Sequence, residues 1–171
     1  PPQNIPFMRF EPITSHDLNE LMNLQPEGWS DIIPEIEYYI RSGFCFPLKV
    51  TVDHVIAGIG TAIVYGQTAW LAHIIVGAGF RNRGIGFQIV QELLKSIQHN
   101  PVGTCLLTAT EMGKPVYTKA GFRTISEYVF MNREKPLQQQ PVSINMVDFQ
   151  EKYRKEILQL DKRISAEDRE S

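Results

Sequence analysis

Between residues 44 and 76 the hydrophobic pattern is that of extended chain, and this stretch limits the fold more than any other. Three runs rich in β-branched and aromatic residues, at residues 44–52, 55–65 and 68–76, follow one another directly. Only two residues separate each run from the next. Connections this short join antiparallel strands, so the pattern predicts a three-stranded meander.

A loop rich in glycine and arginine, residues 77–86, joins this meander to a strongly amphipathic helix. Ile85, Ile89 and Leu93 recur on one face of that helix at helical spacing. The whole order predicts an α+β fold with one central sheet flanked by helices. In chain order the other expected elements are a strand at residues 6–13, two helices before residue 43, a strand at 105–109, a short helix at 112–120 and a strand at 122–131.

The composition excludes several classes of protein. Lys and Arg number 17 and Asp and Glu 19, a net charge of −2, which argues against a dedicated nucleic-acid-binding protein. No apolar run approaches the length of a membrane span, and the first residues lack the regions of a secretory signal. We therefore expect a cytoplasmic protein, with Cys45 and Cys105 as buried reduced thiols.

The loop before the amphipathic helix is typical of an anion site. The start of a helix presents unpaired N–H groups and the positive end of the helix dipole, which suit a phosphate or pyrophosphate. Arg81 adds positive charge, and Gly84 and Gly86 let the backbone approach a ligand. The P-loop and dinucleotide-binding patterns are both absent, since no lysine follows Gly86 and neither Asn82 nor Ile89 is the required glycine. A tight loop without a ligand is the alternative.

A second pattern follows the next expected strand and ends in a Gly-Phe pair. Together, the two patterns resemble the signatures of the GNAT superfamily of acyl-CoA-dependent N-acetyltransferases. The first signature, Q/R-x-x-G-x-G/A, is matched within residues 81–86, and the second is a short helix that bears a tyrosine. Two positions depart from the family, where Asn and Ala are common. The second pattern comprises Thr110 (in place of Asn), Gly113 (in place of Ala), Tyr117, Gly121 and Phe122.

The resemblance covers residues 1–131 and implies a three-layer fold with a mixed, mostly antiparallel sheet. In this family the sheet opens between its fourth and fifth strands, and the pantetheine arm pairs with the free edge of the fourth strand. Acetyl-CoA is the co-substrate, and no metal is implied. The cofactor-binding residues implied in this sequence are Ile75, Val76, Arg81, Asn82, Arg83, Gly84, Ile85, Gly86, Thr110, Gly113 and Tyr117.

The resemblance also implies direct attack of an amine on the acetyl thioester. The backbone N–H near Ile74 would stabilise the oxyanion, and Tyr117 would protonate the CoA thiolate, since a phenol remains protonated at neutral pH. A purely packing role for Tyr117 is the alternative. A non-catalytic acyl-CoA-binding sensor or scaffold is the alternative function, because fold and cofactor motif do not establish chemistry.

The general base is left open. Some relatives carry Glu or His on the fourth strand, at positions occupied here by Trp70 and Ala72. His73 is adjacent, but strand alternation predicts that its side chain points to the other face. Glu27, Glu111 or a chain of water molecules are the remaining choices.

The acceptor is expected to be a small-molecule amine, with a peptide amine left open. Glu27 and Trp29 lie in a loop that resembles the acceptor-side loop of the family. Nearby Asp31 and Glu35 add negative charge, which favours a cationic amine. No nucleic acid or membrane partner is expected, and a homodimer is left open.

The last forty residues allow two interpretations. Residues 132–141 are typical of a linker, and residues 142–171 contain a strand candidate and an amphipathic helix. This extension resembles the start of a second GNAT-like unit, in which case the chain is part of a longer tandem protein. In the other interpretation it docks on the first domain or covers a dimer interface.

Overall fold

A five-stranded sheet forms the centre of the computed structural model, which describes residues 8–129, 131 and 146–169. The strands lie in chain order, and β5 is parallel to β4 whereas the other neighbours are antiparallel. This mixed sheet confirms the predicted fold class and the meander. The strands are β1 (Met8–Pro12), β2 (Cys45–Val52), β3 (Val55–Tyr65), β4 (Thr68–Val76) and β5 (Thr104–Leu107).

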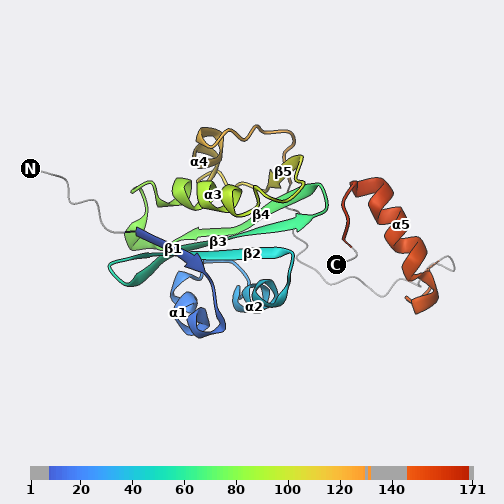
Figure 1. The fold of residues 1–171 in the computed structure, drawn as a ribbon, viewed down its shortest axis with the longest axis horizontal. Helices are drawn as coiled ribbons and strands as arrows, with labels where there is room; N and C mark the ends of the chain where they lie inside the picture. Colours follow the sequence, from blue (N-terminus) through green and yellow to red (C-terminus); the bar gives the residue numbers. More distant parts are fainter. Residues whose placement is uncertain (1–7, 130, 132–145, 170–171) are drawn as a thin grey trace, which may run out of the picture.

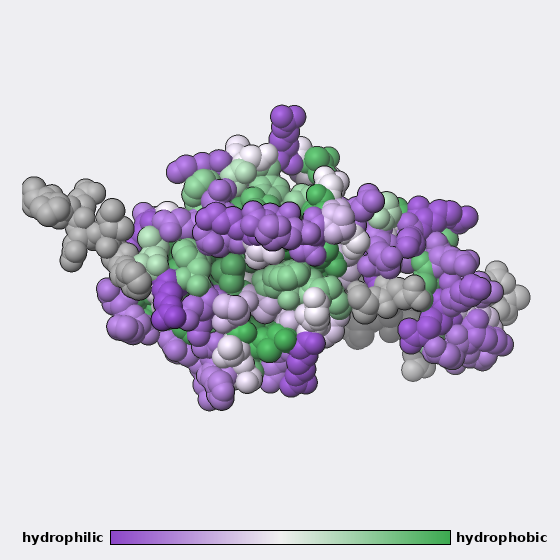
Figure 2. All heavy atoms as spheres, viewed as in Figure 1, coloured by the Kyte–Doolittle hydropathy of each residue, from purple (hydrophilic) through white to green (hydrophobic). Residues whose placement is uncertain are grey.

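Helices cover both faces of the sheet and give the predicted three layers (Figure 1). Helices α1 (Leu18–Leu21) and α2 (Ile33–Arg41) cover one face, and α3 (Ile85–Ser96) and α4 (Lys114–Lys119) lie on the other. Each interface has its own cluster of buried apolar side chains. In the space-filling view, apolar side chains gather between the upper and lower helices, where the sheet lies (Figure 2). Short 3-10 turns lie at Ser15–Asp17, Met22–Leu24 and Ala78–Phe80.

The strand predicted at residues 122–131 is not formed in the described part of the chain. Residues 122–129 have no regular secondary structure, and the side chains of Ile125 and Val129 are 83% and 82% exposed. A strand needs a neighbour to complete its hydrogen-bond ladder, and no described strand pairs with this segment. The predicted linker, residues 132–141, lies outside the described residues, as does the strand candidate before Met146.

The predicted C-terminal helix is confirmed. A 3-10 turn at Glu151–Tyr153 leads into α5 (Arg154–Ser165), which stands to the side of the sheet (Figure 1). Residues 166–169 then return to the sheet, where Glu167 is buried. None of the described helices is long and apolar enough to cross a membrane.

Two glycines of β3, Gly58 and Gly60, allow α3 to pack directly against the sheet. A Cβ atom on Gly60 would lie 2.7 Å from Cγ2 of Ile89 and 2.9 Å from Cδ1 of Leu93. Because such distances are shorter than van der Waals contact, a larger residue must push the helix away or force off-rotamer side chains.

Gly60→Ala is therefore expected to lower the free energy of unfolding by about 2 kcal/mol. Denaturant titration measures this change. Gly43→Ala is the matched control, since no atom lies within 4 Å of its added Cβ. Equal stability of the two variants would mean that α3 does not depend on this close approach.

Candidate active site

The sheet opens between β4 and β5, as the family resemblance implied. Strand β5 ends at Leu107 opposite Leu71, whereas β4 continues to Val76 with no described strand paired to it on that edge. Nε of Arg81 donates a hydrogen bond to the carbonyl oxygen of Val76 at 3.1 Å, so this carbonyl faces away from β3. Ile74 precedes Val76 by two residues, the spacing at which backbone groups of a regular strand face the same edge.

A cavity of about 510 Å³ lies at this opening. It brings together four of the residues predicted for the site: Trp29, Ile74, Thr110 and Tyr117. Glu27, which was predicted to bind the acceptor, is exposed and does not line this cavity. Glu111 is likewise exposed and outside it. The remaining lining residues are Ile63, Tyr65, Trp70, Leu71, Ala72, His73, Thr108 and Arg169.

A β-bulge in β4 changes the position of His73. Ile75 pairs with Ile59 and Ala72 pairs with Thr61, so two residues of β4 oppose the single residue between those partners on β3. His73 has a φ of 48°, in the left-handed region that histidine tolerates better than most residues. The bulge interrupts the alternation of side chains along the strand.

The prediction that His73 points to the other face was therefore wrong. Its ring lies 5.5 Å from the ring of Tyr39 on α2, and 6.2 Å from that of Trp29. Trp70 and Ala72 pack against the same buried cluster as Tyr39. His73 thus lies on the face where a base was sought and lines the cavity.

The surroundings of His73 favour a neutral imidazole. Burial lowers its pKa from 6.5, and the negative charge of Glu35 opposes this effect only in part. Its Nδ1 lies 3.1 Å from Oη of Tyr39. Burial raises the pKa of Tyr39 to about 12, so this partner remains an uncharged phenol. A neutral histidine with a fixed ring is suited to accept a proton.

Tyr117 lies on α4 and lines the same cavity. Burial raises the pKa of its hydroxyl above 10.0, so the group remains a proton donor at neutral pH. A Cβ on Gly113 would lie 2.8 Å from the Tyr117 ring, which explains glycine where the family commonly has alanine. Thr110 Oγ1 accepts the Gly113 N–H at 3.2 Å and so supports the turn before α4.

The loop before α3 has the geometry of an anion site. Asn82 and Gly84 have φ values of 60° and 78°, and alternation of this kind turns successive N–H groups toward one side. The N–H of Gln88 donates to the carbonyl of Gly84 at 3.2 Å, which is the first hydrogen bond of the helix. The helix N–H groups before Gln88 therefore have no partner within the helix. Arg83 packs over the Phe80 ring at 5.7 Å. None of the residues 81–86 lines the cavity.

The family comparison identifies the chain. Residues 18–133 match the model of a protein family described as "Acetyltransferase (GNAT) domain". The chain belongs to this family. No curated protein matches it in sequence. The match spans both signatures, at residues 81–86 and 110–122.

Several solved structures share this GNAT fold. An acetyltransferase from Trypanosoma brucei is 15% identical, with a TM-score of 0.61 over 74% of this chain and 100% of its own. The aminoglycoside N-acetyltransferase AAC(6')-Iy in complex with CoA is 14% identical, with a TM-score of 0.64 over 78% and 99% of the two chains. Glucosamine-6-phosphate N-acetyltransferase from Arabidopsis thaliana is 14% identical, with a TM-score of 0.59 over 74% and 98%. At these identities the likeness extends to the fold alone.

Sequence reasoning missed two contributions to the cavity. The first is the bulge at His73, which the sequence of β4 does not signal, since that strand contains no glycine. The second is Arg169, which reaches the cavity from the C-terminal extension. No pattern in the sequence pairs that extension with β4.

Proposed function

We propose that this GNAT protein transfers the acetyl group of acetyl-CoA to a small-molecule amine by direct attack. One observation carries the proposal: His73, Ile74 and Tyr117 line a single cavity. They supply a neutral imidazole, a backbone N–H at an open strand edge and a protonated phenol. Amine acetylation needs a proton acceptor, a hydrogen-bond donor to the oxyanion and a proton donor. These three groups can fill those roles.

The fit to acetyl-CoA rests on two features of this chain. The open edge of β4 offers the pantetheine arm a strand to pair with. The N–H groups before and within the first turn of α3 offer a site for the pyrophosphate. Both lie on the same side of β4, because Arg81 bridges the loop to the carbonyl of Val76.

Each residue then has one role in the transfer. With its proton on Nδ1 and donated to Tyr39, His73 takes a proton from the amine at Nε2. The amine nitrogen forms a bond to the acetyl carbon, and the Ile74 N–H stabilises the resulting oxyanion. When the carbon–sulfur bond breaks, Tyr117 donates its proton to the thiolate. The products are the N-acetylated amine and CoA.

Calorimetric titration of acetyl-CoA tests the binding half of the proposal. A Cβ on Gly86 has ordinary contacts, the nearest 3.7 Å from Val76 Cγ2, so Gly86→Ala should bind like the wild type. Gly86→Glu adds a negative charge in the first turn of α3, close to the expected pyrophosphate, and we expect affinity to fall at least about tenfold. Arg81→Glu should weaken binding similarly.

Release of free thiol with a panel of amines tests the chemical half. Tight acetyl-CoA binding with no thiol release for any amine would favour the non-catalytic binding module. Equal acetyl-CoA affinity in wild type and Gly86→Glu would contradict the proposed pyrophosphate site.

A further inference from the structure

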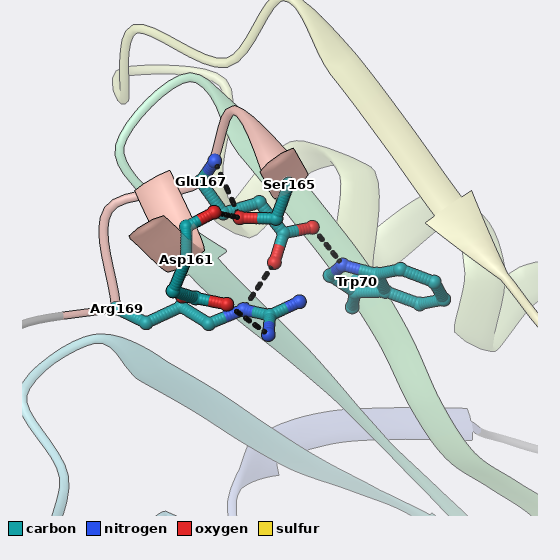
Figure 3. Close-up of polar contacts among 5 residues, drawn as sticks. All are labelled: Trp70, Asp161, Ser165, Glu167 and Arg169. Atoms are coloured by element: carbon teal, nitrogen blue, oxygen red, sulfur yellow. Dashed lines mark hydrogen bonds and ion pairs between the residues drawn. The ribbon is translucent and has the colours of Figure 1, made fainter. Parts of the chain in front are cut away.

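The C-terminal residues after α5 are anchored to β4 by a buried polar contact. Glu167 is 3% exposed, and its Oε1 accepts a hydrogen bond from Nε1 of Trp70 at 2.6 Å (Figure 3). The two residues are 97 positions apart in the chain. A buried carboxylate is costly unless it is paired and hydrogen-bonded, so this contact fixes where the extension meets the cavity.

Arg169 is held by two carboxylates of the same segment. Its Nε donates to Oε2 of Glu167 at 2.5 Å, and its Nη1 donates to Oδ1 of Asp161 at 3.2 Å. The guanidinium carbon lies 5.9 Å from the centre of the Tyr65 ring. Figure 3 shows the guanidinium extending from the segment after α5 toward Trp70. These contacts orient a long side chain that would otherwise be mobile.

The guanidinium keeps N–H groups for a ligand. In the part of the chain that the structure describes, no group accepts a hydrogen bond from Nη2 of Arg169. Arg169 also lines the cavity, together with Tyr65, Trp70 and His73. The unused donors are therefore available to a molecule whose amine lies at His73.

The charges around Arg169 limit what it can recognise. Glu167 and Asp161 already offset its single positive charge, so a further anion gains little and meets two like charges. An uncharged oxygen avoids that repulsion and still accepts a directional hydrogen bond from a charged donor, which is stronger than a neutral one.

We propose that Arg169 determines acceptor specificity by donating hydrogen bonds to an amide carbonyl oxygen carried by the amine. This inference rests on the proposed function, since it assigns the acceptor end of the same cavity. Glu167 is a positioning residue that holds the guanidinium and ties it to Trp70. The acceptor is thus an amino amide whose amine reaches His73 while its carbonyl reaches Arg169.

Binding to the CoA-loaded protein tests this assignment without requiring turnover. The chain has 2 tryptophans, and both line the cavity, so intrinsic fluorescence reports on its occupant. The probes are ω-amino amides, the branched alkylamines of matching shape and the ω-amino carboxylates, each in a series of chain lengths. We expect the best amide to bind about tenfold more tightly than its alkyl counterpart, and the carboxylate to bind no better than the amide.

Arg169→Ala should bring the ratio of amide to alkyl affinity close to unity. Glu167→Gln keeps an oxygen for Trp70 but removes the ion pair, and should lower the ratio in part. Arg163→Ala is the matched control, because Arg163 is exposed in the same segment and does not line the cavity. Its ratio should equal that of the wild type.

Two results would overturn the assignment: no preference for amides in the wild type, or a preference that survives in Arg169→Ala. Thiol release measured on the same probes separates this outcome from failure of the proposed function. An amide preference without thiol release leaves Arg169 assigned and removes the transferase. Thiol release without an amide preference supports the transferase and removes the assignment of Arg169.

Discussion

Tyr117→Phe should lower kcat about a hundredfold while the affinity for CoA stays unchanged. The substitution removes only the hydroxyl, and the ring keeps its contacts with Gly113 and Phe122. Without that hydroxyl the thiolate must leave unprotonated, which raises the barrier of the step in which the carbon–sulfur bond breaks. Steady-state kinetics at saturating amine, together with calorimetric titration of CoA, measures both quantities.

The control for Tyr117 is Tyr128→Phe. Tyr128 is 70% exposed and does not line the cavity, so kcat should be that of the wild type. A normal kcat in Tyr117→Phe would show that the residue only packs. A parallel loss of CoA affinity would show that it holds the cofactor rather than donating a proton.

His73→Asn is expected to lower kcat/KM for the amine about a hundredfold. Asparagine tolerates the left-handed backbone that His73 adopts, so the bulge should persist in the variant. The amide of asparagine is not basic, and the amine would have to lose its proton to water. The ratio of kcat/KM values gives the lost transition-state stabilisation directly.

The pH profile distinguishes a base from a residue that only fills space. Burial lowers the pKa of His73 below 6.5, so the neutral, active form is lost only as the pH falls below that value. In the wild type, kcat/KM should therefore rise with pH through a limb below 6.5 and then become independent of His73. His73→Asn should lack this limb.

His54→Asn is a closely matched control for the same experiment. His54 lies in the turn between β2 and β3, is exposed and also has a left-handed backbone, with a φ of 67°. Its substitution should leave both kcat/KM and the acid limb unchanged. A limb that persists in His73→Asn would assign the proton transfer to another group.

Most of the fold was predictable because its determinants are local. The two-residue connections at 53–54 and 66–67 specify a meander, and the apolar spacing from Ile85 specifies α3. The strand predicted at residues 122–131 failed because strand formation depends on a partner rather than on the segment itself. The apolar pattern of residues 122–129 is the same whether or not a partner strand is present, so the sequence alone could not decide between strand and loop.

The candidate site was predictable mainly on its proposed acyl-CoA side, with Trp29 the one predicted acceptor-side residue that lines the cavity. Tyr117 and Thr110 lie in a short local motif, and the structure brings both to the cavity with Ile74. The acceptor side depends on a one-residue bulge and on a contact between Trp70 and Glu167 from the far end of the chain. Strand alternation gives the wrong face after a bulge, and spacing carries no information about so distant a contact.

The bulge at His73 also couples the two halves of the site through their register. Because β4 carries one residue more than the facing stretch of β3, every side chain from Ile74 to Val76 takes its direction from that extra residue. Substitution of His73 by a residue that tolerates the left-handed backbone, such as asparagine, changes the chemistry and leaves this register intact. Deletion of the position would restore regular pairing and shift the edge proposed to face acetyl-CoA by one residue. A point substitution at position 73 can therefore change the chemistry of the candidate site, whereas a change in the length of β4 would also change the edge proposed to bind acetyl-CoA.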